Sequence, residues 1–134
     1  MTKESILVTG GCGFIGSEAV RRLTNEGYSV YNFDKLSYAS CPESLENISK
    51  SNYTFLQGDL FNKNSIFEFL KISKPHYILN FAAESHVDRS IDGPIDFINS
   101  NIVGTYNLLE ASLDYFSNLS REKKKLFKFI HIST

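Results

Sequence analysis

A short apolar segment that runs directly into three glycines restricts the fold of this chain more than any other feature. Residues 5–9, Ser-Ile-Leu-Val-Thr, have the composition of a buried strand. Gly10, Gly13 and Gly16 follow, and apolar residues then recur at helical spacing over 15–23. This order of strand, glycine turn and helix indicates a dinucleotide site, because the N-terminal N–H groups and the dipole of the helix would face the phosphates.

Each glycine has its own task in such a site. Gly10 would turn the chain sharply off the strand, Gly13 would leave room for the pyrophosphate, and Gly16 would let the helix pack closely. Phe14 and Ile15, between the last two glycines, are also predicted to bind the cofactor. A glycine-rich turn without a ligand is the alternative, and the flanking strand and helix favour the dinucleotide site.

An acidic residue at the end of the second strand tests this interpretation. Residues 28–33 are rich in strand-forming side chains, and Asp34 follows them, 18 residues after Gly16. A carboxylate there would accept hydrogen bonds from the adenosine ribose and repel a 2′-phosphate, which predicts NAD in preference to NADP. Lys35 weakens this prediction because a cation tolerates a phosphate, and a strand-end cap is the alternative role for Asp34.

Composition excludes several other classes of protein. The 134 residues suit one domain, and a net charge of −1 gives no broad basic field, so no nucleic-acid partner is predicted. The basic run at 121–125 is predicted to be a solvated loop. The two cysteines suggest no disulfide framework, and no metal site is predicted. Without a signal peptide or a long apolar stretch, we expect a cytoplasmic protein with no membrane partner.

Strand and helix patterns alternate along the whole chain. The predicted strands are 5–9, 29–34, 53–56, 76–81 and 126–132. The predicted helices are 14–26, a short one near 43–49, one capped by Asn62 or Asn64 that stops before Pro75, and 94–116. In the last helix, the side chains predicted to face the sheet are Ile98, Ile102, Thr105, Leu109 and Ser112.

Apolar strands separated by helices indicate an α/β fold with a doubly wound parallel sheet. Right-handed crossovers and a reversal after the third strand predict the strand order 3-2-1-4-5. Ligands should then lie where the glycine turn meets residues 82–86, at the carboxyl ends of the first and fourth strands. Such folds normally continue beyond a fifth strand. We therefore expect 1–134 to be an incomplete NAD-binding Rossmann domain, truncated after its fifth strand and without a substrate domain.

Several segments resemble a known family. Residues 9–17 resemble the fingerprint of extended short-chain dehydrogenase/reductases that act on nucleotide sugars. More specific segments, similar to those of the dTDP-glucose 4,6-dehydratases, are 33–39, 58–60, 82–90, 99–105, 108–111 and 131–134. The resemblance covers essentially the whole chain. It implies NAD as cofactor, dTDP-glucose as substrate, and a homodimer that uses the helix at 94–116.

The family reaction is an internal redox cycle performed by a lyase. NAD takes a hydride from C4 of the glucose, water is lost across C5 and C6, and the hydride returns at C6. A tyrosine and a lysine four residues later act in the oxidation, and an Asp-Glu pair acts in the elimination. Neither pair is found at a matching position here, so we expect the 134-residue chain alone to be inactive. Tyr31 and Lys35 have the right spacing but lie on a strand, roughly 13 Å apart.

The resemblance also implies roles for individual residues. Asp59 would accept a hydrogen bond from the adenine amine, and Thr134 would be the catalytic residue that donates to the sugar C4 oxygen. Ser85 and His86 are predicted to bind the substrate. The other predicted cofactor-binding residues are Lys35, Ser37, Leu60, Ala82, Ala83, Ser85 and Asn101. The alternatives without a ligand are a strand-end turn at Asp59, tight packing of the alanines and a surface loop at His86.

Two other functions stay open at this point. One is another nucleotide-sugar epimerase or dehydratase of the same family, against which the match at 84–90 argues. The other is an NAD-binding module without catalysis. An Asp-Glu pair directly after the Ser-Thr at 133–134 would favour the dehydratase.

Overall fold

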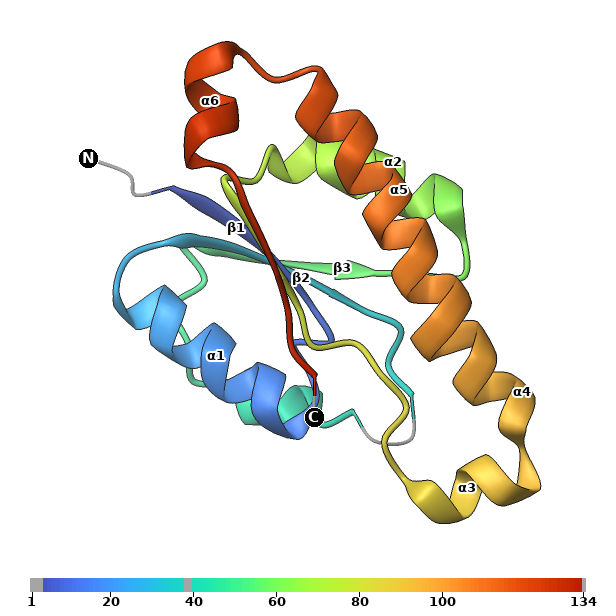
Figure 1. The fold of residues 1–134 in the computed structure, drawn as a ribbon. Coiled ribbons are helices and arrows are strands. Elements are labelled where there is room, and N and C mark those ends of the chain that lie inside the picture. The colour runs from blue at the N-terminus through green and yellow to red at the C-terminus, as the bar shows by residue number, and fades with distance from the viewer. Residues whose placement is uncertain (1–3, 38–39, 134) are drawn as a thin grey trace.

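A five-stranded sheet runs through the computed structural model, which describes residues 4–37 and 40–133 (Figure 1). The strands are β1 (Ser5–Thr9), β2 (Ser29–Asp34), β3 (Tyr53–Gln57), β4 (Tyr77–Asn80) and β5 (Lys128–His131). They lie in the order β3-β2-β1-β4-β5, and every neighbouring pair is parallel. The predicted α/β class and strand order are therefore confirmed.

Helices cover both faces of this sheet. On one face lie α1 (Phe14–Asn25) and the 3₁₀ turn η1 (Pro42–Leu45), and on the other lie α2 (Lys63–Ser73) and α5 (Gly104–Ser117) (Figure 1). The remaining helical elements are α3 (Val87–Asp92), α4 (Pro94–Phe97), the π-helical segment η2 (Ile98–Val103) and α6 (Arg121–Leu126). In the part of the chain that the structure describes, no helix is long and apolar enough to span a membrane.

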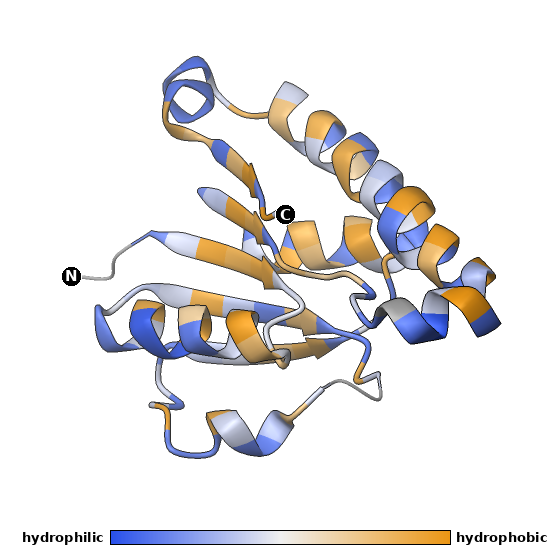
Figure 2. Cartoon of the chain, turned by 60° about the horizontal axis from the view of Figure 1, so that its bottom comes forward, coloured by the Kyte–Doolittle hydropathy of each residue, from blue (hydrophilic) through white to orange (hydrophobic). Residues whose placement is uncertain are grey.

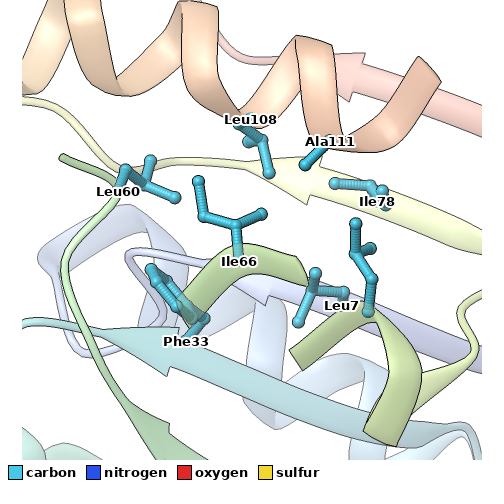
Figure 3. Close-up of a cluster of buried hydrophobic side chains, with 8 residues drawn as sticks. Leu7, Phe33, Leu60, Ile66, Ile78, Leu108 and Ala111 are labelled. Atoms are coloured by element: carbon cyan, nitrogen blue, oxygen red, sulfur yellow. The ribbon is translucent and has the colours of Figure 1, made fainter. Parts of the chain in front are cut away.

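Two apolar clusters fix these layers together. On the α2 and α5 face, the buried residues are Leu7, Phe33, Leu60, Ile66, Leu70, Ile78, Leu108 and Ala111 (Figure 3). On the α1 face, they are Ile6, Val8, Cys12, Val20, Val30, Leu45 and Ile48. Successive residues of β1 thus point to opposite faces and are buried on both. This explains why β1 is a continuous apolar run in the sequence.

The predicted helix at 94–116 is present, but its buried face differs from the prediction. Ser112 is buried as predicted, whereas Ile98, Ile102 and Leu109 are exposed. The residues of α5 that are buried are Gly104, Asn107, Leu108, Ala111 and Ser112. The prediction was wrong because this helix carries two apolar faces, and periodicity alone does not say which of them packs on the sheet.

Smaller differences from the prediction concern short segments. The basic run at 121–125 belongs to helix α6, not to a loop, and the Ser120 hydroxyl caps this helix by accepting a hydrogen bond from the Lys123 N–H at 3.3 Å. Strand β5 accordingly begins at Lys128 rather than at 126. The short helix expected near 43–49 is a 3₁₀ turn, and α3 was not predicted.

Two glycines provide a matched test of how tightly the glycine turn is built. Gly10 has a φ of +72°, and a Cβ there would lie 2.7 Å from the Ala82 amide nitrogen. Gly93 has a φ of −135°, and a Cβ there would make only ordinary contacts, the nearest at 3.6 Å. We predict that Gly10→Ala lowers the free energy of unfolding by at least about 2 kcal/mol, and Gly93→Ala by less than about 1 kcal/mol. Urea denaturation measures both, and equal losses would contradict the prediction.

Candidate functional site

A cleft opens at the carboxyl ends of the strands, where the strand order reverses between β1 and β4. It encloses about 590 Å³, counted to include its open mouth. Its described lining residues are Gly10, Gly13, Phe33, Asp34, Lys35, Ser37, Ser40, Gly58, Asp59, Leu60, Phe81, Ala82, Ala83, Glu84 and Ser100. Open α/β sheets bind ligands at such a reversal point, so the cleft lies where the topology predicts.

Most of the predicted cofactor-binding residues line this cleft. They are Gly10, Gly13, Asp34, Lys35, Ser37, Asp59, Leu60, Ala82 and Ala83. The predicted residues that the structure places beside the cleft or away from its lining are Phe14, Ile15, Gly16, Ser85, His86 and Asn101. Thr134, the predicted catalytic residue, lies outside the described residues. The binding roles of all these residues stay predictions.

The glycine turn is held by backbone contacts. The Gly10 N–H donates to the Phe33 carbonyl at 2.8 Å, and the Gly13 N–H donates to the Gly10 carbonyl at 3.2 Å. A Cβ at Gly16 would collide with the same Gly10 carbonyl oxygen. Gly13, the N-cap of α1, has no side chain that could cap the helix, and Phe14 beside it is 94% exposed. The first turn of α1 therefore offers its amide groups to an anion.

Asp34 joins the end of β2 to this turn. Its Oδ2 accepts a hydrogen bond from the Cys12 N–H at 2.9 Å. Its Oδ1 accepts from the Leu36 N–H at 2.7 Å and from the Ser40 hydroxyl at 3.1 Å. The side chain is buried and still lines the cleft. Asp34 is therefore a strand-end cap whose residue also lines the cleft, and its predicted contact with a ribose is compatible with both.

The opposite wall of the cleft is the segment after β4. The Asn80 carboxamide oxygen accepts hydrogen bonds from the Thr9 hydroxyl and, at 3.3 Å, from the Ala82 N–H. Asn101 on η2 pairs with the backbone of Glu84: its Oδ1 accepts from the N–H at 2.8 Å, and its Nδ2 donates to the carbonyl at 2.9 Å. Asn101 thus positions this wall without lining the cleft.

The outer end of the cleft lies after β3. Asp59 accepts a hydrogen bond from the Phe61 N–H at 3.0 Å, which is the turn contact expected for a residue without a ligand. Asp59 is nevertheless exposed in the cleft, so the turn and an adenine-binding role are compatible. Leu60 is buried, and the Asn107 side chain of α5 donates to its carbonyl at 3.0 Å. Helix α5 therefore fixes the floor at this end.

Several lining residues were missed by the sequence-based prediction. They are Phe33, Ser40, Gly58, Phe81, Glu84 and Ser100. Glu84 matters most, because its Oε1 lies 3.4 Å from the Lys35 Nζ, which also donates to the Ser100 hydroxyl at 3.0 Å. The signal in the sequence was an acidic residue directly after Ala83 and a lysine directly after Asp34.

Tyr31 packs partly buried against the core while Lys35 lines the cleft, so this pair does not act together.

The two cysteines differ in burial and therefore in expected reactivity. Burial raises the pKa of the Cys12 thiol from 9.0 to about 11, and the negative charge of Asp34 adds to this shift. Cys41 is exposed. We predict that iodoacetamide at pH 8 alkylates Cys41 in the folded chain, and that Cys12 reacts only after denaturation. Intact mass reports the number of adducts, and Cys41→Ser should give none in the folded state.

The raised pKa of Cys12 also determines how the stability of the fold changes with pH. Above pH 9 the unfolded chain loses the Cys12 proton while the folded chain keeps it. This thiol therefore contributes stability that is fully present below pH 9 and is lost as the pH rises toward 11.

For the alkylation experiment, two adducts on the folded chain at pH 8 would contradict the predicted protection of Cys12.

Comparisons with known proteins agree with this geometry. Residues 7–134 match the family model described as GDP-mannose 4,6 dehydratase. A dTDP-glucose 4,6-dehydratase from Shigella flexneri is 52% identical over 131 residues, which are 96% of this chain and 36% of that protein. A probable dTDP-glucose 4,6-dehydratase from Sinorhizobium fredii is 47% identical over 130 residues, again 96% of this chain and 37% of that protein. The chain thus spans somewhat over a third of the length of these relatives.

Solved structures share the fold of nearly the whole chain. A dTDP-glucose 4,6-dehydratase from Bacillus anthracis, in complex with NAD, has a TM-score of 0.80 and 32% identity, over 98% of this chain and 38% of that one. A UDP-glucose 4-epimerase from Thermotoga maritima, with UDP-glucose, has a TM-score of 0.79 and 32% identity, over 96% of this chain and 37% of that one. The fold therefore fits both kinds of enzyme equally well.

Proposed function

Because this chain belongs to the GDP-mannose 4,6 dehydratase family, we propose that it binds NAD and forms the cofactor-binding part of a dTDP-glucose 4,6-dehydratase. That enzyme would be an NAD-dependent lyase that forms a 4-keto-6-deoxy sugar nucleotide. The observation that carries the proposal is that the glycine turn, Asp34 and the Ala82–Ala83 pair meet in one cleft. The curated relatives at 47% and 52% identity have the dehydratase name.

Residues of this chain would hold each part of the cofactor. The amide groups of the first turn of α1 would bind the pyrophosphate. Asp34 would accept a hydrogen bond from the adenosine ribose, and Asp59 would accept one from the adenine amine. Ala82 and Ala83 would let a ribose lie close to the backbone, because their side chains are small. When bound, NAD would supply the acceptor for the substrate hydride.

The curated relatives favour the dehydratase over the epimerase, which the solved structures do not distinguish. The solved dehydratase and epimerase structures are both 32% identical to this chain, with almost the same TM-score. The curated dehydratases are more similar in sequence, and the segment at 84–90 is the part that resembles them. We therefore place another nucleotide-sugar epimerase or dehydratase second. A cytoplasmic location stays a prediction.

Catalysis requires groups that the 134 residues do not bring together. Tyr31 and Lys35 are the one tyrosine–lysine pair four residues apart in the sequence, and Tyr31 lies on a strand. The sequence contains no adjacent Asp-Glu pair for the elimination. We propose that these 134 residues bind NAD without forming the 4-keto product by themselves. Loss of one general base alone typically lowers a rate by about 10²–10⁴.

Cofactor titration tests the proposed function. We predict that the chain binds NAD more tightly than NADP, because the Asp34 carboxylate accepts a ribose hydroxyl and repels a 2′-phosphate. Asp34→Ala should narrow the ratio of the two dissociation constants by about tenfold, since both effects are lost. Isothermal titration calorimetry with each cofactor measures the ratio. Asp114→Ala removes an exposed acid on α5 outside the cleft and is the matched control.

Two outcomes of the titrations would contradict the predicted role of Asp34. NADP binding as tight as NAD binding by the unaltered chain would exclude Asp34 as the selecting residue. Asp34 also accepts the Cys12 N–H, so thermal unfolding of each variant must accompany the titrations. A folded Asp34→Ala chain with an unchanged ratio would count against the proposal in the same way.

We further propose a homodimer formed by the outer face of the helices from α3 to α5. A stripe of apolar side chains, each 44–74% exposed, runs along this face: Ile91, Ile95, Ile98, Ile102, Tyr106, Leu109 and Leu113. Figure 2 shows apolar residues recurring along these helices. A continuous apolar surface of this kind is typical of a protein interface. The edge strand β5, with exposed Ile130, and the exposed Ile132 directly after it form a second candidate surface.

Charged substitutions distinguish the stripe from the core. Leu108, on the same helix, is fully buried and therefore belongs to the core and not to the stripe. We predict that Ile102→Glu combined with Leu113→Glu converts a dimer to a monomer in light scattering after size exclusion, because the charges would be buried in the interface. Leu108→Ala should instead lower the free energy of unfolding by about 2–5 kcal/mol. A clean monomer at high concentration for the unaltered chain would contradict the homodimer.

A further inference from the structure

A charged contact crosses the cofactor cleft. The Lys35 Nζ, from the segment after β2, lies 3.4 Å from the Glu84 Oε1, from the segment after β4. The same Nζ donates to the Ser100 hydroxyl on η2 at 3.0 Å. Strand β1 lies between β2 and β4 in the sheet, so the contact bridges the two walls of the cleft. Among the described residues that line the cleft, no other carries a cationic side chain.

Glu84 is fixed in place independently of its charge. Its backbone N–H donates to the Asn101 Oδ1, and its carbonyl accepts from the Asn101 Nδ2. Its side chain is only 9% exposed, while that of Lys35 is 35% exposed. Because solvent screens a buried carboxylate less than an exposed one, Glu84 is a stronger partner for an ammonium than a surface acid. Lys35 therefore lies beside a largely buried carboxylate whose backbone is fixed by Asn101.

The charges of Asp34 and of the Lys35–Glu84 pair determine the electrostatic surroundings of a 2′-phosphate on the ribose. Asp34, the expected partner of the ribose, keeps its carboxylate at the cleft through bonds to Cys12, Leu36 and Ser40. A phosphate adds about −1.5 to −2 charges, and it would approach this carboxylate. Among the described residues that line the cleft, the cation that could offset the repulsion is Lys35, which is already paired with Glu84.

We propose that Glu84 is a specificity residue for the cofactor. By holding Lys35, it withholds an ammonium from a 2′-phosphate and so reinforces the selection of NAD that Asp34 begins. A lysine released from Glu84 would bind the phosphate as a point charge. This inference rests on the proposed NAD site and adds to it a residue that acts through another side chain rather than on the ribose itself.

The test removes the charge of Glu84 and keeps its shape. In Glu84→Gln, NADP should bind about five- to tenfold more tightly than in the unaltered chain, while NAD binding changes by less than about twofold. The gain should disappear in the double variant Glu84→Gln/Lys35→Met, because it depends on the released ammonium. It should also shrink at higher salt concentration, since a partly exposed charge pair is screened. Glu110→Gln, an exposed acid on α5, is the matched control.

Each outcome decides between the inference and its premise. An unchanged NADP affinity in folded Glu84→Gln, with NAD still bound, would overturn the role of Glu84 and leave the proposed function standing. An equal gain for NAD and NADP, or a gain that persists with Lys35→Met, would also overturn it. Failure of the unaltered chain to bind NAD would overturn the proposed function and the inference together. If Glu84→Gln does not fold, Ser100→Ala is the second variant. It removes the hydroxyl that accepts a hydrogen bond from Lys35, and it should increase the affinity for NADP by a smaller factor.

Discussion

The cleft depends on the carboxylate of Asp34, which joins the glycine turn to the loop after β2. Its donors come from Cys12 on one side and from Leu36 and Ser40 on the other. A buried donor or acceptor left without a partner costs about 1–3 kcal/mol, so neither segment can move away alone. Leu36 has a φ of +61°, which is strained for a leucine. The hydrogen bond from the Leu36 N–H to Asp34, at 2.7 Å, offsets that strain.

The two walls meet at Gly10, where only hydrogen on the α-carbon leaves room for the backbone of Ala82. A polar chain continues from this point across the sheet: Thr9 donates to Asn80, and the Asn80 Nδ2 lies 3.0 Å from the His131 Nδ1 of β5. Buried polar groups tolerate little displacement once every partner is placed. The width of the cleft is therefore set by the backbone directly after β1 and β4, at Gly10 and Ala82.

Local patterns made the sheet and most of the cleft predictable from the sequence. The turn at Gly10 and the acid at Asp34 follow directly on apolar strands, and handed crossovers then restrict the strand order. Contacts between distant segments were not predictable in this way. Lys35 and Ser100 are 65 residues apart in sequence, and Glu84 and Asn101 are 17 residues apart. The buried face of α5 was missed for another reason, because Leu108 and Leu109 are equally apolar and only the packed sheet distinguishes them.

The π-helical segment η2 connects the cleft with the apolar stripe. On its inner side, Ser100 bonds Lys35 and Asn101 bonds Glu84. On its outer side, Ile98 and Ile102 are exposed and belong to the apolar stripe. Segments with π-helical geometry are rare and often occur at functional sites, because the wider turn re-aims neighbouring side chains. The segment η2 thus separates the charge contact proposed to select the cofactor from the surface proposed to meet a second copy. A substitution on that outer surface can reach the Lys35–Glu84 contact through this single turn, so cofactor affinity and mass in solution must be measured on the same variants.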